Sequence, residues 1–384
     1  MRHLSARNTR RLFIVLVAAL ATALPIAALG EGASRVHPQL ARVWEMLDAG
    51  DAVTIAYFGG SITWGATATD PLTRSWRALV TRGLEERFPR ARIRPVDAAI
   101  GGQPSKLGVF RVDRDVIPHD PDLCFVEFAV NDWAAADSAE TIEGIVRKLL
   151  RSRPDMAIVL VLIGSENHYV ASPAQPQQIA LARHYGLPFI DVATPVGERI
   201  AAGLDVRAIL TDGCHPNDTG YRLYADIILG RLAALATAAG PPGTAPEAPL
   251  TPNRYESATM LELAKLPDLG GWKPDTPSLV GTWFDQQPSR WHSSCIAPGA
   301  AGAKLAVDID CAGVGLYYEV TKGGGTLVLA VDENETRRIE TTQDLPYARV
   351  MFCFDLLDGS SHRRLTLTAT RAEHTKVAYL LLTK

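Results

Sequence analysis

The sequence predicts an α/β domain followed by a smaller all-β domain, and three observations support this division. Residues 53–238 alternate continuous apolar runs with amphipathic stretches, the pattern of buried parallel strands and the helices that cover them. Residues 240–252 contain five prolines, which is typical of a linker. Beyond Gly270, short runs rich in Val, Thr and Leu are separated by Gly, Asp and Pro, as in a β-sandwich.

The N-terminal segment comes before either domain and has the order of an export signal. Residues 1–11 contain four arginines and no acid, residues 12–24 are apolar, and small residues follow at Ala27, Ala28 and Gly30. We therefore interpret residues 1–30 as a signal peptide for a periplasmic or extracellular protein. Residues 9–13 (TRRLF) also resemble a twin-arginine signal, with the Sec route as the alternative. Pro25 and the short apolar core argue against an uncleaved membrane anchor.

The predicted α/β domain covers residues 31–238 and has a parallel sheet between two layers of helices. Its apolar runs predict the strands Val53–Phe58, Ile93–Ala98, Leu123–Val130, Ala157–Ile163 and Pro188–Val192. The amphipathic stretches between them predict the helices Ser75–Phe88, Ala139–Arg151, Gln177–His184 and Gly220–Ala238.

Residues 239–252 form the predicted linker, and residues 253–384 the predicted jelly-roll-like β-sandwich. The expected strands of the sandwich are Lys304–Ile309, Val314–Val320, Thr326–Val331, Ala348–Phe354, Leu365–Thr370 and Val377–Leu382.

Composition excludes several classes of protein. The chain has 384 residues, 47% of them hydrophobic, which excludes a disordered protein. Its net charge is −3 and no basic stripe is present, so we expect no nucleic-acid partner. Five cysteines without a CxxC pair predict neither a disulfide scaffold nor a structural zinc site.

The residues suited to chemistry stand at the predicted strand ends. Ser61 follows the first strand and two glycines, at the edge of the sheet where open α/β folds place their sites. Asp212 and His215 precede a helix, and their spacing lets the carboxylate orient the imidazole within one turn. Gly101-Gly102 ends a further strand and offers backbone N–H groups, and Asn131 ends another and offers a side-chain amide. Together with the N–H of Ser61, these donors suit an oxyanion hole.

Taken one at a time, each motif has an ordinary structural interpretation. Gly-Gly-Ser is common in plain turns, and Asn131 is a frequent turn former. Asp212 and His215 also fit a helix cap or half of a metal site. No second histidine cluster completes a metal set, so we expect no metal. The order of the motifs and their shared place at strand ends favour catalysis by Ser61, His215 and Asp212.

At this point the sequence resembles the SGNH, or GDSL, hydrolase superfamily over roughly residues 50–238. Its four blocks correspond here to residues 58–63 (FGGSIT), 99–103 (AIGGQ), 129–132 (AVND) and 212–216 (DGCHP). The resemblance implies a flavodoxin-like sheet, no cofactor, Ser61 as nucleophile, His215 as base and Asp212 as its orienter. It also implies an oxyanion hole formed by Ser61, Gly102 and Asn131.

Two positions depart from that family pattern. Gly60 stands where the family usually has aspartate, and Ala129 where it usually has glycine. Neither departure removes a catalytic group, but together they leave the substrate undefined. The α/β-hydrolase alternative requires Gly-x-Ser-x-Gly and fails because Thr63 takes the place of the last glycine.

Exported SGNH enzymes with an added β-sandwich resemble carbohydrate esterases. The expected function is hydrolysis of short acyl esters, acetyl in particular, on a polysaccharide or oligosaccharide. An acyltransferase or a lipid or general esterase using the same residues is one alternative, and a non-catalytic carbohydrate-binding protein is another. We expect an acylated glycan or another small ester as partner, and no stable membrane insertion.

Several further side chains are candidates for binding substrate. Trp64, Trp133 and His168 lie close in sequence to the predicted strand-end loops. The alternative is loop packing for the two tryptophans and an exposed position on a surface loop for His168. The second domain adds aromatic residues that either stack on sugar rings or belong to its core: Trp272, Trp283, Trp291, Tyr317 and Tyr318. Glu127 and Asp132 are expected to have structural roles, as a buried hydrogen-bonded group and a loop tie.

Overall fold

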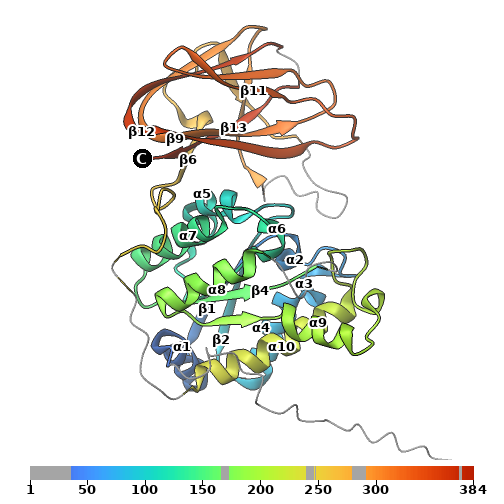
Figure 1. The fold of residues 1–384 in the computed structure, drawn as a ribbon. Helices are drawn as coiled ribbons and strands as arrows, with labels where there is room; N and C mark the ends of the chain where they lie inside the picture. Colours follow the sequence, from blue (N-terminus) through green and yellow to red (C-terminus); the bar gives the residue numbers. More distant parts are fainter. Residues whose placement is uncertain (1–35, 166–172, 239–245, 247, 279–290, 372–373) are drawn as a thin grey trace, which may run out of the picture. The chain divides into compact units, whose positions relative to one another are not determined.

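A computed structural model describes residues 36–165, 173–238, 246, 248–278, 291–371 and 374–384 (Figure 1). The predicted signal peptide, residues 1–30, lies outside the described residues. Within the described ranges, no helix is both long enough and apolar enough to cross a membrane.

The first domain is built on a parallel sheet whose strand order is β2-β1-β3-β4-β5. This is the flavodoxin-like order that the resemblance implied. Every pair in the sheet is parallel, so the carboxyl ends of the strands lie at one edge. The strands are β1 (Ala52–Gly59), β2 (Arg92–Ala99), β3 (Leu123–Glu127), β4 (Ala157–Leu162) and β5 (Phe189–Asp191).

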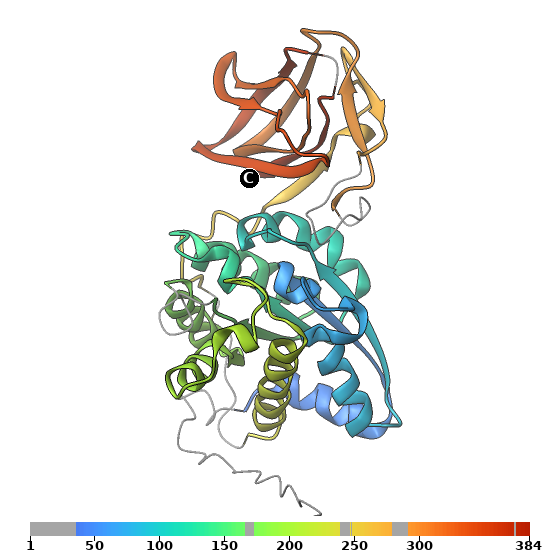
Figure 2. The same cartoon turned by 90° about the vertical axis from the view of Figure 1, so that its right-hand side faces the viewer.

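Helices pack on both faces of this sheet, as Figures 1 and 2 show. Alternate residues of β1 point to opposite faces: Ile55 and Tyr57 join one apolar cluster, and Ala56 and Phe58 join the other. The first cluster includes residues of α1 (Pro38–Ala49), α4 (Trp76–Arg87), α9 (Ala193–Ala201) and α10 (Asp218–Ala236). The second includes residues of α5 (Ser105–Asp115), α7 (Ser138–Ser152) and α8 (Ala174–Tyr185).

One predicted strand of the first domain is too long. The apolar run predicted a strand from Leu123 to Val130, but β3 ends at Glu127 and a short helix, α6 (Ala129–Asp132), follows. The N–H of Asp132 donates to the carbonyl of Phe128 (2.8 Å), which closes this helical turn. Sheet pairing stops where the turn begins, and hydrophobicity alone gave no sign of this.

The described part of the second domain is an antiparallel sheet that curls around its own apolar cluster. Along the sheet the order is β11-β10-β12-β9-β13-β8-β7, and β6 pairs with β13. The strands are β6 (Thr259–Glu262), β7 (Trp272–Asp275), β8 (Cys295–Pro298), β9 (Lys304–Val320), β10 (Thr326–Val331), β11 (Asn334–Glu340), β12 (Arg349–Ala369) and β13 (Val377–Thr383).

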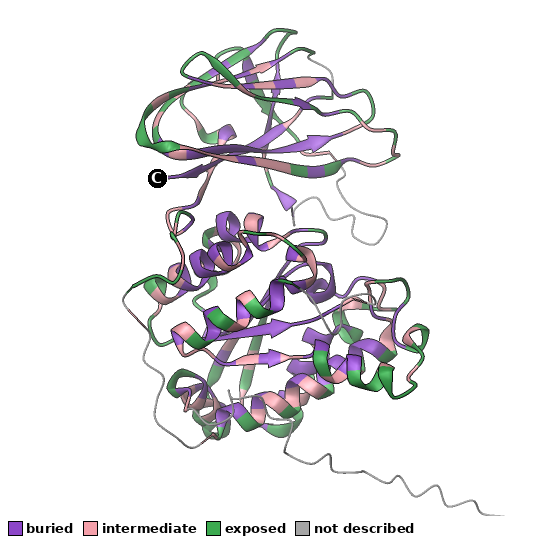
Figure 3. Cartoon of the chain, viewed as in Figure 1, coloured by how far each residue is buried: buried purple, intermediate pink, exposed green. Residues whose placement is uncertain are grey.

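Four of the predicted strands are in fact halves of two long ones. The segments 304–309 and 314–320 are both part of β9, and 348–354 and 365–370 both belong to β12. The polar residues between the halves stay extended because they pair across the sheet, with Cys311 opposite Ser361 and Asp310 opposite His362. A register shift between Leu356 and Ser361 accommodates the irregularity. Figure 3 marks in purple the buried positions along the strands of this sheet.

The chain between the two domains is partly fixed. Residues 239–245 and 247 of the predicted linker lie outside the described residues. At the end of the linker, the N–H groups of Leu250 and Thr251 donate to the carboxylate of Glu143 on α7 (2.5 and 2.8 Å). Further contact comes from Phe110 on α5, whose ring lies 4.8 Å from that of Phe354 on β12.

Candidate active site

The strand β1 delivers Ser61 to the edge of the parallel sheet. Gly59 ends the strand, Gly60 caps a one-turn helix, α2 (Ser61–Trp64), and Ser61 is its first residue. The N–H groups of Trp64 and Gly65 donate to the carbonyls of Gly60 and Ser61 (both 3.0 Å). These bonds hold the serine at the start of a closed turn. Ser61 is only 4% exposed, so little water reaches its hydroxyl.

His215 and Asp212 come from the loop before α10. The carboxylate of Asp212 accepts the backbone N–H groups of Cys214 (2.8 Å) and His215 (2.7 Å) through Oδ1. Its Oδ2 lies 2.9 Å from Nδ1 of the His215 ring. Burial raises the pKa of Asp212, but these hydrogen bonds outweigh it and hold the pKa below its ordinary value. The carboxylate therefore stays ionised and orients the imidazole.

The same ring also reaches the serine. Nε2 of His215 lies 2.9 Å from Oγ of Ser61. The three side chains therefore form one continuous hydrogen-bonded chain from carboxylate to hydroxyl. Such a chain can remove the hydroxyl proton and stabilise the resulting imidazolium. The structure thus brings together the three residues that the sequence proposed as a triad.

Asn131 lies against the nucleophile turn. A Cβ atom built on Gly60 would stand 2.0 Å from Oδ1 of Asn131 and 3.6 Å from the carbonyl oxygen of Gln103. The amide of Asn131 and the loop 100–103 therefore both border the residue before Ser61. The N–H of Ile100 donates to the carbonyl of Gly59 (3.1 Å), which fixes the start of that loop.

Gly102 has a backbone conformation that favours glycine. Its φ is +69°, a left-handed value that favours glycine, and a Cβ there would meet open space. Two of the three donors proposed for an oxyanion hole thus lie on segments that border the Ser61 turn.

The candidate substrate-binding residues have different surroundings. Trp64 is 8% exposed and packs with Ala66 and Ala99, which favours the packing role for its ring. Trp133 is half-buried and follows Asn131 closely, with a φ of +36°. His168 lies outside the described residues.

Most of the aromatic candidates in the second domain are core residues. Trp272, Trp291, Tyr317 and Tyr318 are all buried, so their faces are not open to a sugar. Trp283 lies outside the described residues.

Two acidic residues have the structural surroundings that the sequence suggested. Glu127 is buried on β3 and accepts a hydrogen bond from Oγ1 of Thr63 on α2 (2.8 Å). Asp132 is buried and accepts hydrogen bonds from the N–H and hydroxyl of Ser105 (both 2.8 Å) and the hydroxyl of Ser138 (2.7 Å). Burial raises the pKa of Glu127 to about 7 and that of Asp132 to about 6.

One supporting residue was missed by the sequence analysis. Arg111 on α5 is fully buried and donates to the carbonyls of Gly59 (2.9 Å) and Ala98 (2.7 Å), at the ends of β1 and β2. Its guanidinium lies 4.4 Å from the ring of Phe58 and pairs with Asp115 (2.9 Å). The only sign in the sequence that Arg111 supports the strand ends was its place among the apolar residues Val109, Phe110 and Val112.

The chain is similar to known proteins in sequence and in fold. Residues 57–223 match the model of the GDSL-like lipase/acylhydrolase family. The solved structure of a two-domain esterase active on acetylated mannans, with bound mannopentaose, is 26% identical; the alignment covers 92% of this chain and 96% of that one, with a TM-score of 0.79. A second structure of a two-domain esterase active on acetylated mannans is 24% identical and shares the fold, with a TM-score of 0.77. The alignment covers 92% of this chain and 97% of that one. None of the curated proteins matches the sequence.

Proposed function

We propose that this protein, whose residues 57–223 match the model of the GDSL-like lipase/acylhydrolase family, is an exported serine esterase that removes acetyl groups from a polysaccharide or oligosaccharide. The observation that carries the proposal is the hydrogen-bonded chain from Asp212 through His215 to Ser61, with 2.9 Å at each side-chain step. His215 lies between a carboxylate and a hydroxyl, and acyl transfer through serine requires this arrangement.

The reaction proceeds in two steps. Oγ of Ser61 attacks the ester carbonyl carbon while Nε2 of His215 takes the hydroxyl proton. The oxyanion that forms accepts hydrogen bonds from the N–H groups of Ser61 and Gly102 and the amide of Asn131. The C–O bond to the sugar then breaks, and the sugar oxygen leaves with the proton held by His215. An acetyl ester on Ser61 remains.

Water completes the cycle. His215 takes a proton from a water molecule, whose oxygen attacks the acetyl carbonyl. The bond to Ser61 breaks, Oγ recovers the proton from His215, and acetate is released. Throughout both steps Asp212 keeps the ring in one orientation and stabilises its protonated form.

The substrate class rests on the similarity to the two-domain esterase. That protein acts on acetylated mannans, and the similarity extends over both domains of the present chain. Acetylated mannan is therefore the first glycan to test. We also propose that residues 1–30 are removed on export, which N-terminal sequencing of the exported protein checks.

Hydrolysis of nitrophenyl esters of increasing chain length tests the chemistry. We expect turnover to fall steeply beyond acetate. Ser61→Ala should abolish it, and Asp212→Asn should lower kcat by about 10⁴ because the ring loses its correct tautomer. Cys214→Ala is the matched control and should keep most of the activity. Burial raises the pKa of the Cys214 thiol to about 12, so the thiol stays protonated beside His215.

Release of acetate from acetylated mannan tests the substrate. Activity on nitrophenyl acetate without activity on any acetylated glycan would contradict the glycan assignment. A preference for long acyl chains would assign the protein to lipids instead. A folded protein with no turnover would favour an acyltransferase or a non-catalytic carbohydrate-binding protein. Acetyl transfer to an added sugar acceptor is then the next measurement.

A further inference from the structure

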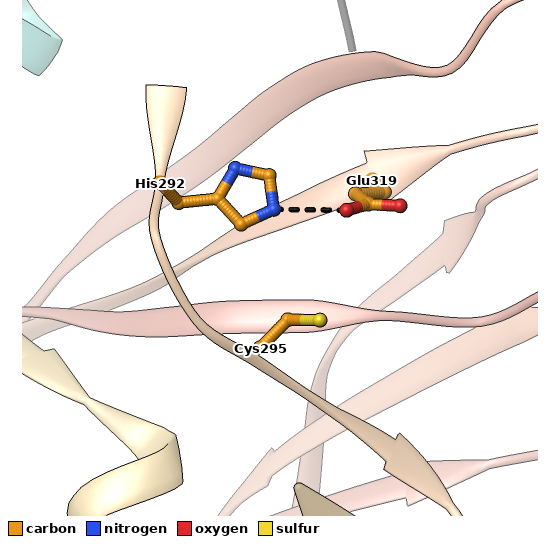
Figure 4. A group of neighbouring side chains, drawn as sticks. All are labelled: His292, Cys295 and Glu319. Carbon is orange, nitrogen blue, oxygen red and sulfur yellow. Dashed lines mark hydrogen bonds and ion pairs between the residues drawn. The ribbon is translucent and has the colours of Figure 1, made fainter. Parts of the chain in front are cut away.

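Three side chains of types that serve as transition-metal ligands lie together inside the second domain. They are His292 and Cys295, on the segment that leads into β8, and Glu319 on β9 (Figure 4). One nitrogen, sulfur or oxygen atom from each lies within 4.8 Å of the other two. Nε2 of His292 faces Oε1 of Glu319 at 2.8 Å. All three residues are buried, with at most 1% of each exposed.

The cluster has polar atoms that the described residues do not satisfy. Oε2 of Glu319 and Nδ1 of His292 have no hydrogen-bond partner there. Oε1 of Glu319 accepts from His292 and from the N–H of Ser278 (2.9 Å). Buried polar atoms of this kind are rare in folded proteins and indicate a missing water, ion or ligand.

The charges of the cluster also call for a cation. The carboxyl group of Glu319 is buried, with only 1% of the residue exposed. The neighbouring cation, Lys376, donates to the carbonyl of Thr276 and pairs with Asp275 at 3.7 Å. A divalent ion bound by a carboxylate, a thiolate and a neutral imidazole would make the buried group electrically neutral.

We propose that His292, Cys295 and Glu319 bind a zinc ion. Imidazole, thiolate and carboxylate are the ligands of zinc, whereas calcium and magnesium prefer oxygen alone. Tetrahedral zinc places such ligand atoms roughly 3.4–3.6 Å apart, so the atoms present need only small side-chain shifts. The thiol of Cys295 now donates weakly to the carbonyl of Asp275 (3.3 Å) and would release its proton on binding.

The ion would join two separate parts of the second domain. His292 and Cys295 are three residues apart on one segment, and Glu319 comes from a neighbouring region of the sheet. None of the three takes part in the proposed ester hydrolysis. The metal site is therefore structural, and the proposal does not depend on the proposed function. A CxxC search missed this set because its ligands are of three different types.

Metal content of the purified full-length chain tests the proposal. The protein is reduced with a phosphine, incubated with zinc, freed of excess ion by gel filtration and analysed by mass spectrometry for metals. We expect about one zinc per chain, and loss of this ion in Cys295→Ser and Glu319→Gln. Cys353→Ser, at a half-buried cysteine of the same domain, should keep it. Excess zinc at about 100-fold its Kd should raise the Tm by roughly 5–10 °C.

Two results would overturn the site. One is retention of the same zinc by Cys295→Ser, which would place the ion elsewhere. The other is a folded wild-type protein that holds no zinc and shows no change in Tm. If the variants fail to fold, cobalt added to the wild type decides, because a thiolate–cobalt charge-transfer absorption band must appear if Cys295 is a ligand.

Discussion

Gly60 stands where the family that residues 57–223 match usually has aspartate before the serine, and the packing around it gives a physical reason for glycine. A Cβ at this position would stand 2.0 Å from Oδ1 of Asn131, which is far inside contact distance. The φ of Gly60 is −95°, so any residue type could adopt this backbone. The requirement for glycine is therefore one of space, because Asn131 occupies the volume that a side chain would take.

Gly60→Ala should consequently displace the amide of Asn131 and impair catalysis. We expect kcat on nitrophenyl acetate to fall by about 10²–10³, as for loss of one oxyanion donor, with little change in KM. Gly230→Ala, on α10 where a Cβ meets open space, is the control and should leave kcat unchanged. In steady-state kinetics the double variant with Asn131→Ala should be no slower than Asn131→Ala alone. Fully additive losses would contradict this account.

Glu127 should make the stability of the protein depend on pH. Burial raises its pKa from 4.5 to about 7, so between these values the folded protein binds more protons than the unfolded chain. The free energy of unfolding therefore falls as pH rises from about 5 to 7. Glu127→Gln removes this effect and keeps an acceptor for Thr63. We expect the variant to equal the wild type near pH 4 and to be more stable by about 2–3 kcal/mol at pH 8.

Urea unfolding at pH 4, 5, 6, 7 and 8 measures this difference. Asp132 also has a raised pKa and is present in both proteins, so its own burial contributes equally to both; its charge also helps to raise the pKa of Glu127. Glu45→Gln, at an exposed position of α1, is the matched control. A constant difference between Glu127→Gln and the wild type at every pH would disprove the role of this carboxyl.

The predicted site residues were accessible from sequence for a simple reason. Ser61, Asn131 and Gly102 follow strands of one parallel sheet, so a correct set of strands already places them at one edge. Asp212 and His215 are close in sequence, which makes their contact local. Glu127 and Arg111 act through long-range hydrogen bonds to Thr63 and Gly59. Nothing in the local sequence specifies such partners.

At the scale of elements, Arg111 connects α5 to the ends of β1 and β2. Arg111→Leu leaves the carbonyls of Gly59 and Ala98 without their donor and breaks the pair with Asp115. We expect the free energy of unfolding in urea to fall by about 3 kcal/mol. Arg111→Lys should recover only part of it, since an ammonium lacks the planar fork of the guanidinium.

Arg92, an exposed residue on β2, provides a control for the Arg111→Leu measurement. Arg92→Leu should change the free energy of unfolding by no more than about 0.5 kcal/mol. Arg111→Leu with wild-type stability would show that α5 is held by its apolar face alone.

Elements with a plain hydrophobic pattern were predicted well, and the others were not. The strands β1, β2 and β4 differ from prediction by at most one residue at each end. Helix α5 was missed because buried Arg111 interrupts its apolar face and Gly108 lowers its helix propensity. In β9 and β12, polar residues looked like breaks, yet cross-strand pairing keeps them extended.

At the scale of the whole molecule, one apolar cluster includes residues of both domains. Phe110 on α5 belongs to it together with Tyr255, Tyr317 and Phe354 from the second domain. Nearby, Arg114 on α5 donates to the carbonyl of Trp291 (2.9 Å). Each domain helps to bury the rings of the other, so unfolding of either domain would expose apolar surface on its partner at a cost in free energy. The two domains should therefore unfold together.

Phe354→Ala tests this coupling, because the residue lies in the second domain while the activity belongs to the first. We expect the loss of this ring to lower the midpoint of thermal inactivation of nitrophenyl acetate hydrolysis by roughly 5–10 °C. Calorimetry should show one transition that moves with it. Met351→Ala removes an exposed side chain from the same strand and should leave both unchanged. Two separate transitions, with the inactivation midpoint unaffected by Phe354→Ala, would mean that the domains are energetically independent.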